Sequence, residues 1–536
     1  MFSKQDDSIG VCIKIPNRVI PVIFVPGVMG TNLMQKKPTQ DEVSVPIWVM
    51  NDSSKLDGLL IAKNWGPKDA KERKILLNPQ TTEVYDGGTL PSGAAPGFIH
   101  TGATQTEKDA ELRRRGWGEV AEKSYGKWLT WLETQLNNPE YYRTGVPPEL
   151  LRHLVACPPG VEPLTKAEGS LAYRYQFPVH VVGYNWLQSN ADSANRLQKK
   201  IIEFMNYYNT KINGHTCEKV ILVTHSMGGL VARYYTEVLK QSDKVLGVVH
   251  GVMPDIGSAT AYKRVKAGTE GDGVVGTITS YVLGHNAAEM TAVFAQSPGP
   301  LQLLPSPAYG NGWLKIKDGK HYEALPIKGD PYGEIYTVRS KWWGLIDDKL
   351  INPMDKKKLT IDKDWRAFVD LMNDDVKKFH NNIANHYHPN TYAFYGDDKA
   401  HKTWGEVVWQ RISSPALLIP QKSFDSLDNA SDSALNFDSG QGYIELRGKS
   451  DGRQIQASFE IGKANENGDG TVPAHSGRAP QGRSGVKLCI GYPGVDHEGA
   501  YKKEPQRLFA LWALTKVLQN VKGTPLDYPS ATECKA

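Results

Sequence analysis

The sequence lacks the features of a membrane-spanning or conventionally secreted protein. It has no run of about 18 or more apolar residues, which a transmembrane helix requires. Its first residues lack the hydrophobic stretch of a signal peptide. We therefore expect a soluble protein, made in the cytoplasm and not transmembrane, whose export would need a dedicated secretion system.

Cysteine is scarce, with only five in 536 residues. Their odd number and scattered spacing fit neither a disulfide framework nor a metal site. Cys217 and Cys489 lie in or near strand-like runs, and we expect both to be small buried hydrophobic side chains. The others are Cys12, Cys157 and Cys534.

An excess of one charge is also absent. The 63 basic and 58 acidic residues give a net charge of +5 and are spread along the chain without a basic tract. Nucleic acid is therefore not expected as a partner. Hydrophobic residues make up 40% of the chain and charged residues 23%, which is typical of a globular protein. The length allows one elaborated domain or two smaller ones.

What the sequence does contain is a serine between a strand-like run and a helical pattern. Residues 219–223 are mostly branched and apolar, Ser226 follows in a tight turn, and helical periodicity begins at 230. This order is a nucleophile elbow, which exposes the serine hydroxyl above a sheet. Gly228 is the small residue expected two positions after the serine, whereas Thr224 stands where glycine is usual. We interpret Ser226 as a nucleophile.

An early glycine-rich turn complements this serine. Val22–Val25 reads as a strand buried on both faces, and Pro26–Gly30 follows it as a tight turn. In serine hydrolases of this architecture, such a loop supplies one backbone N–H of the oxyanion hole, and the residue after the nucleophile supplies the other. We expect Val28 or Met29 to provide the first donor and Met227 the second.

Strands and helices alternate around the elbow. We expect strands at Val179–Trp186, Val245–Val252, Thr391–Gly396 and Val486–Gly491. Alternation over 179–260 predicts right-handed βαβ units and a parallel sheet. The sequence therefore predicts an α/β-hydrolase fold, a mostly parallel central sheet flanked by helices.

Three parts are expected along the chain. Residues 1–260 form the first part of the hydrolase core, with an irregular insertion at 35–103. Residues 261–390 form a largely helical cap or lid. Residues 391–536 complete the core, with an insertion at about 399–465.

Two insertions have a distinctive composition. Between 273 and 314 the only charged side chain is Glu289, so this segment reads either as an apolar lid over the site or as two further core helices. Tyr443–Arg447 and Gln454–Ile461 alternate apolar and polar residues on either side of Asp451-Gly452, which predicts a β-hairpin.

A serine hydroxyl needs a histidine to accept its proton and an acid to orient that histidine. In the hydrolase fold the chain order is serine, acid, histidine, with each residue in a loop after a strand. Asp469 and His497 meet this requirement, and each lies in a glycine-containing loop. We assign His497 as general base and then acid, and Asp469 as its orienting acid.

Other acids occupy plausible positions. Asp397 and Asp398 directly follow the strand at 391–396, and Asp255 lies one strand earlier. His225 adjoins Ser226, but its side chain should point away from it. The other histidines near these motifs, His250 and His475, are expected to be structural or to support the site indirectly.

Four segments carry a family resemblance: Pro26–Leu33, Tyr184-Asn185-Trp186, Thr224–Gly229 and Gly468–Pro473. They resemble the lecithin:cholesterol and phospholipid:diacylglycerol acyltransferase branch of the α/β-hydrolases, and the chain is similar to bacterial lipases of that branch, including type VI secretion phospholipase effectors. The resemblance implies that the aspartate of Gly468–Pro473, Asp469, is the triad acid and that His497 is its histidine. Asn185, where the family more often has aspartate, and the long regions 35–103 and 399–465 depart from the pattern.

The resulting expectation is a lipolytic serine esterase, a phospholipase or lipase that releases fatty acid through an acyl-enzyme. Its substrate would be a phospholipid or acylglycerol at a membrane surface. The chemistry requires no cofactor, and a calcium requirement stays open. A bacterial effector of this kind would have a cognate immunity protein. The alternatives are an acyltransferase that uses an alcohol as acceptor and a catalytically silent binding protein.

Overall fold

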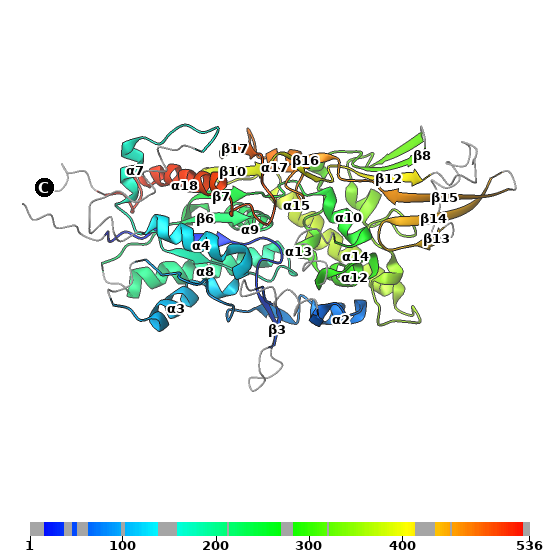
Figure 1. The fold of residues 1–536 in the computed structure, drawn as a ribbon, viewed down its shortest axis with the longest axis horizontal. Coiled ribbons are helices and arrows are strands. Elements are labelled where there is room, and N and C mark those ends of the chain that lie inside the picture. Colours follow the sequence, from blue (N-terminus) through cyan, green and yellow to red (C-terminus); the bar gives the residue numbers. More distant parts are fainter. Residues whose placement is uncertain are drawn as a thin grey trace, which may run out of the picture.

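The computed structural model describes residues 16–36, 45–50, 63–97, 102–137, 158–211, 214–269, 282–318, 321–412, 435–450 and 453–528. Its centre is a six-stranded sheet in the order β17-β10-β7-β6-β1-β5, in which every neighbouring pair is parallel (Figure 1). The strands are β1 (Val22–Val25), β5 (Val179–Val181), β6 (Val220–His225), β7 (Val245–Gly251), β10 (Thr391–Gly396) and β17 (Val486–Tyr492). The predicted α/β-hydrolase fold is confirmed.

Both faces of this sheet are covered by helices. Along β1, Ile23 and Val25 pack with α8 (Asn190–Lys211) and α9 (Gly228–Arg233), whereas Val22 and Phe24 pack with α4 (Glu122–Leu136) and α18 (Glu504–Leu518). Successive side chains of a strand point to opposite faces, so a strand between two helical layers is apolar at every position. This explains the continuous apolar runs in the sequence.

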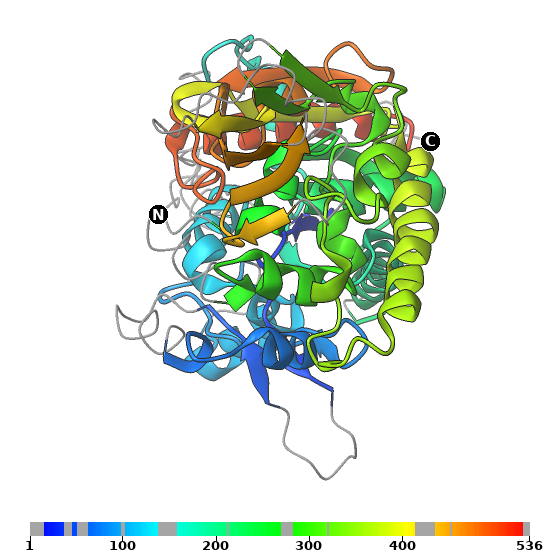
Figure 2. The same ribbon diagram turned by 90° about the vertical axis from the view of Figure 1, so that its right-hand side faces the viewer.

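The insertion at 35–103 is more ordered than predicted. Its described part includes α2 (Ala70–Leu76) and contributes to a three-stranded sheet of β3 (Pro46–Trp48), β2 (Leu33–Gln35) and β4 (Thr82–Val84). Figure 2 shows this blue segment on the lower side of the molecule, away from the orange strands. Strands of three residues are too short to show a periodicity, which is why the sequence read as irregular.

A second six-stranded sheet lies at the right-hand end of the molecule (Figure 1). Its order is β13-β14-β15-β12-β8-β9, and it contains the predicted hairpin, now seen as β14 and β15. The strands are β8 (Leu314–Asp318), β9 (His321–Leu325), β12 (Val407–Ile412), β13 (Leu435–Asp438), β14 (Tyr443–Ser450) and β15 (Arg453–Ile461). The region 261–390 is therefore less purely helical than expected, because β8 and β9 belong to it.

The apolar segment after 273 is described from residue 282 onward. There α12 (Ala287–Phe294) packs against α2, and α13 (Pro298–Leu301) follows. Most residues of both helices are buried, and Met290, Val293, Phe294 and Leu301 belong to the same core as the sheet. The described part thus packs as core helices, one of the two interpretations left open. Residues 270–281 lie outside the described residues, and a lid there stays a prediction.

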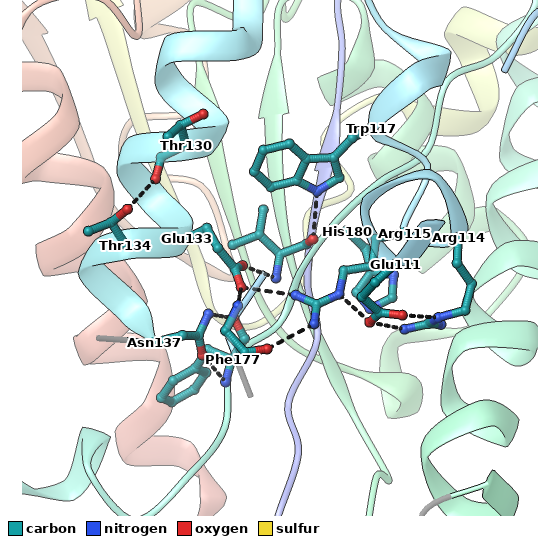
Figure 3. Close-up of polar contacts among 12 residues, drawn as sticks. Glu111, Arg114, Arg115, Trp117, Thr130, Glu133, Thr134, Asn137, Phe177 and His180 are labelled. Carbon is teal, nitrogen blue, oxygen red and sulfur yellow. Dashed lines mark hydrogen bonds and ion pairs between the residues drawn. The ribbon is translucent and has the colours of Figure 1, made fainter. Parts of the chain in front are cut away.

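A buried ion pair fixes the edge strand β5 to the helices beside it (Figure 3). Arg115 ends α3 (Gln105–Arg114) and donates to Glu133 of α4 across 2.9 Å, and both side chains are almost fully buried. Glu133 also accepts the backbone N–H groups of Gly97 at 2.6 Å and Val179 at 2.8 Å. One carboxylate therefore holds three separate segments together.

Cys217 and Cys489 are free and buried, as predicted. Among the described helices, none combines the length and apolar character needed to cross a membrane.

Candidate active site

The elbow predicted around Ser226 is present between β6 and α9. Ser226 has φ 52°, a strained left-handed conformation for a residue with a side chain, and such strain concentrates at functional sites. Its N–H donates to the Gly251 carbonyl at 2.9 Å. A Cβ on Gly228 would lie 2.4 Å from the Val25 carbonyl oxygen, so only glycine lets α9 cross the sheet this closely.

Thr224 replaces the usual glycine without disturbing the elbow. Its hydroxyl lies 2.8 Å from Nδ1 of His250, and both side chains are buried. Burial lowers the pKa of His250 to about 3, and the charge of Arg233 acts in the same direction, so His250 is neutral. The threonine is thus accommodated by a polar partner on β7, and the structural role predicted for His250 matches this position.

Ser226, His497 and Asp469 converge at the carboxyl ends of the central strands. Nε2 of His497 lies 2.8 Å from Oγ of Ser226, and Nδ1 of His497 lies 2.8 Å from Oδ2 of Asp469. A carboxylate only accepts hydrogen bonds, so Nδ1 carries the proton and Nε2 is left to accept from the serine hydroxyl. This is the protonation state that a general base requires.

The loop after β16 (Glu466–Gly468) shapes the surroundings of Asp469. Its Oδ1 accepts the N–H of Thr471 at 2.9 Å and of Val472 at 2.7 Å, and the side chain is buried. Gly470 has φ 87°, which lets the backbone turn back on the carboxylate. The Gly-Asp-Gly-Thr-Val-Pro motif is therefore a turn whose N–H groups hold the acid in place.

The alternative acids lie elsewhere. Asp255 pairs with Arg233 at 2.7 Å and accepts the Tyr387 hydroxyl at 2.8 Å, and it is buried in that cluster. Burial raises the pKa of Asp255, against the opposing effect of Arg233. Its hydrogen-bonding capacity is used by structural partners, and no hydrogen bond links it to His497.

Asp397 and Asp398 also serve neighbouring segments. Asp397 accepts the Asn467 side-chain amide at 2.9 Å. Asp398 contacts Nδ1 of His401 at 2.9 Å and accepts the N–H of Gly494 at 2.8 Å. Hydrogen bonds to backbone and to His401 hold the pKa of Asp398 below its usual range. Both residues brace the loops that carry Asp469 and His497.

His475 lies beside the site without entering it. Its Nδ1 is 2.8 Å from a carboxylate oxygen of Glu466, and its ring packs edge-on against Tyr309. This contact ties the start of α17 (Ala474–Arg478) to β16, so the position of His475 is consistent with the structural role expected for it.

The loop Pro26–Gly30 runs next to the serine. A Cβ on Gly27 would lie 3.0 Å from Cβ of Ser226, and Met29, with φ 62°, has its carbonyl held by the Trp48 indole N–H at 2.7 Å. The N–H groups of Val28, Met29 and Met227 donate to no group among the described residues. These are the three predicted oxyanion donors.

Two side chains at the site were not assigned a role from the sequence. His225 does point away from the Ser226 hydroxyl, but its Nε2 lies 2.7 Å from the carbonyl oxygen of His497. Its Nδ1 lies 2.9 Å from the hydroxyl of Tyr125, a residue of α4. Tyr125 is 100 positions from His225, and no local sequence pattern predicts such a contact. In the described ranges, no group of three or more His, Cys, Asp or Glu side chains is arranged to hold a metal ion.

Comparisons with known proteins agree with this architecture. The family model described as lecithin:cholesterol acyltransferase matches residues 164–342, a span that includes Ser226 but neither Asp469 nor His497. A search of curated proteins finds no match. A chain of the crystal structure of the Tle4-Tli4 complex is 30% identical with a TM-score of 0.76, and the alignment covers 96% of this chain and 100% of that one. The chain therefore belongs to the lecithin:cholesterol acyltransferase-like α/β-hydrolases and is similar to the type VI secretion phospholipase effectors among them.

Proposed function

We propose that the protein is a lipolytic serine esterase that hydrolyses the fatty-acyl esters of phospholipids or acylglycerols through an acyl-enzyme at Ser226. The observation that carries this proposal is the pair of 2.8 Å contacts of His497, one to Ser226 and one to Asp469. A buried acid, an imidazole with an accepting nitrogen and a hydroxyl within hydrogen-bond distance of that nitrogen are the parts that acyl transfer needs.

The reaction follows from these contacts. His497 takes the proton of Ser226 at Nε2 while Oγ attacks the ester carbonyl, and Asp469 stabilises the imidazolium. The negative oxygen of the tetrahedral intermediate is bound by the N–H groups of Met227 and of Val28 or Met29, donors each worth about 100-fold or more in rate. His497 then protonates the departing alcohol. Water then attacks the acyl-enzyme through the same steps and releases the fatty acid. These steps use no cofactor.

Acyl transfer to an alcohol is the second candidate, since the matching family model is named for an acyltransferase. Both activities share the acyl-enzyme and differ in the acceptor. Mass spectrometry of products from phospholipid vesicles, with and without added sterol or diacylglycerol, separates them. We expect free fatty acid and lysophospholipid as the main products. Dominance of a new acyl ester would reject hydrolysis as the principal activity.

We also propose that the protein acts as a secreted antibacterial effector with a cognate immunity protein. The support is its similarity to a chain solved in the Tle4-Tli4 complex. Directing the chain to the periplasm of a bacterial host tests this role. The wild type should stop growth and deplete phospholipid, whereas Ser226→Ala should be tolerated. Equal growth of both strains at equal expression would contradict the effector role.

A further inference from the structure

A chain of hydrogen bonds crosses the candidate active site beneath Ser226. The N–H of Gly27 donates to the Tyr125 hydroxyl at 3.1 Å, that hydroxyl lies 2.9 Å from Nδ1 of His225, and Nε2 of His225 lies 2.7 Å from the carbonyl oxygen of His497. Tyr125 and His225 are each only 4% exposed. The two side chains therefore join the oxyanion loop to the backbone of the histidine that contacts the serine.

In this chain of hydrogen bonds, the donor and the acceptor of each bond can be assigned. The His497 carbonyl can only accept, so Nε2 of His225 carries the proton. Burial lowers the pKa of His225 to about 3, and its ring is therefore neutral with a lone pair on Nδ1. The Tyr125 hydroxyl donates to that lone pair, which leaves its oxygen to accept from Gly27. Reversing the tautomer would break the contact to the carbonyl.

Close packing holds the residues of this chain of hydrogen bonds in place. Tyr125 packs edge-on against Phe24 of β1 at 5.0 Å between ring centroids and against His225 at 5.5 Å. A Cβ on Gly27 would lie 2.8 Å from Nδ1 of His225, so the loop backbone and the imidazole are in close contact. The N–H of His497 is held as well, by the Asp469 carbonyl at 2.9 Å. The packed side chains of Tyr125 and His225 therefore connect the oxyanion loop to the His497 backbone.

We infer, on the basis of the function proposed above, that Tyr125 and His225 are positioning residues that hold the oxyanion loop and His497 in a fixed relation to each other. Both side chains are buried, so we expect neither to touch the substrate. Attack by Ser226 creates the oxyanion and the imidazolium in the same step, so the two groups that stabilise them must be placed together. Loss of this placement affects the transition state more than the bound ester, and kcat should fall while KM changes little.

Tyr125→Phe is the principal test, because it deletes one hydroxyl and keeps the ring. On a short water-soluble ester we expect kcat per titrated active site to fall about 10- to 100-fold, as for a small misplacement of reacting groups. KM should stay within about twofold of the wild type. Affinity for an alkyl boronic acid, whose tetrahedral adduct occupies the oxyanion position, should fall by a similar factor to kcat.

Tyr501→Phe is the matched control. Its hydroxyl donates to the Thr224 carbonyl at 2.8 Å, and its ring lies in the same buried aromatic group, 6.2 Å from His225 and 5.8 Å from Phe24. It loses a buried hydroxyl without belonging to the chain of hydrogen bonds. Its melting temperature should fall as much as that of Tyr125→Phe, whereas its kcat should stay within about twofold of the wild type.

A pair of variants at His225 provides a second measurement. His225→Gln keeps an amide donor for the His497 carbonyl, and His225→Leu removes both polar contacts. We expect the glutamine variant to retain a kcat about tenfold above that of the leucine variant, the value of one buried hydrogen bond. Equal kcat values for these two variants would count against the inference.

Two further outcomes separate this inference from the proposed function. If the wild type hydrolyses the ester and Tyr125→Phe matches it, the positioning role is wrong and the proposed function stands. If the wild type neither hydrolyses the ester nor reacts with a fluorophosphonate, the proposed function fails and the inference fails with it. A kcat loss that Tyr125→Phe and Tyr501→Phe share equally would assign the effect to packing and would also overturn the inference.

Discussion

His497 and Ser226 lie 271 positions apart in the chain, yet Nε2 of one is 2.8 Å from Oγ of the other. The contact exists because β6 and β17 are parallel strands of one sheet, and the loops at their carboxyl ends meet at the same edge. An accepting nitrogen beside a serine hydroxyl is the core of the proposed chemistry.

Asp469→Asn should lower kcat by about 10,000-fold, because an amide in place of the carboxylate favours the wrong imidazole tautomer and cannot stabilise the imidazolium. Ester hydrolysis per milligram of folded protein measures this effect. Asp397→Asn is the matched control and should stay near wild type, since among the described residues the Asp397 carboxylate accepts from the Asn467 side chain and has no hydrogen bond to His497. A severe loss in the control with a mild one in Asp469→Asn would show that the acid is misassigned.

Trp48→Phe should lower kcat about tenfold, because it releases the Met29 carbonyl and loosens the oxyanion loop. Initial-rate assays on a soluble ester give kcat and KM, and KM should change little. Trp117→Phe deletes an equally buried indole N–H, which donates to the Val179 carbonyl at 2.9 Å away from the serine. Its kcat should be unaffected. Equal losses of kcat in both variants would mean that the Trp48 contact has no specific role in the loop.

Glu133→Gln should reduce the free energy of unfolding by about 1.5–3 kcal/mol, because it removes one of the two charged partners of the buried Arg115 and leaves only Glu111, at 2.7 Å. Urea denaturation followed by tryptophan fluorescence measures the change. In the exposed pair of Lys200 and Glu203, Glu203→Gln should cost less than about 1 kcal/mol. A cost for Glu133→Gln as small as that of the control would contradict the anchoring of β5.

The stability of the fold should fall below about pH 6.5. Burial lowers the pKa of His225 and of His250 to about 3 and of His380 to about 4, against an ordinary value of 6.5. Between these values the unfolded chain binds protons that the folded chain does not. Each such histidine therefore removes about 1.4 kcal/mol of unfolding free energy per pH unit as the pH falls.

His380→Gln tests this dependence away from the serine. His380 contacts the Tyr332 hydroxyl at 2.6 Å and the Gln302 carbonyl at 2.8 Å. Urea denaturation from pH 5 to 8 should show a slope smaller than that of the wild type by about 1.4 kcal/mol per unit below pH 6.5. Above pH 7.5 the difference between the two proteins should be constant. An unchanged slope at low pH would show that His380 is protonated in the folded protein.

The sequence predicted those parts of the site that local residues determine. An apolar strand followed by a tight turn marks Ser226, and the glycines around Asp469 mark a turn that closes on a carboxylate. The partners of these motifs could not be predicted in the same way. Tyr125 reaches His225 only because α4 packs under β1 and β6, and that packing depends on the whole core.

Similar reasons explain what the sequence missed in the fold. β8 and β9 are five residues long and include charged or polar side chains, so they gave no strand signal within the predicted helical cap. They become strands because β8 pairs with β12 and β9 pairs with β8. Pairing between distant segments leaves little trace in either segment alone.

The most direct test of the account is covalent labelling of the full-length protein by a fluorophosphonate, followed by mass spectrometry of its peptides and an ester hydrolysis assay. We expect a single adduct on Ser226, and we expect Ser226→Ala to lose both the adduct and nearly all hydrolysis while it keeps the wild-type circular dichroism spectrum. Folded wild-type protein without an adduct at Ser226, or a Ser226→Ala variant that hydrolyses the ester near the wild-type rate, would contradict it.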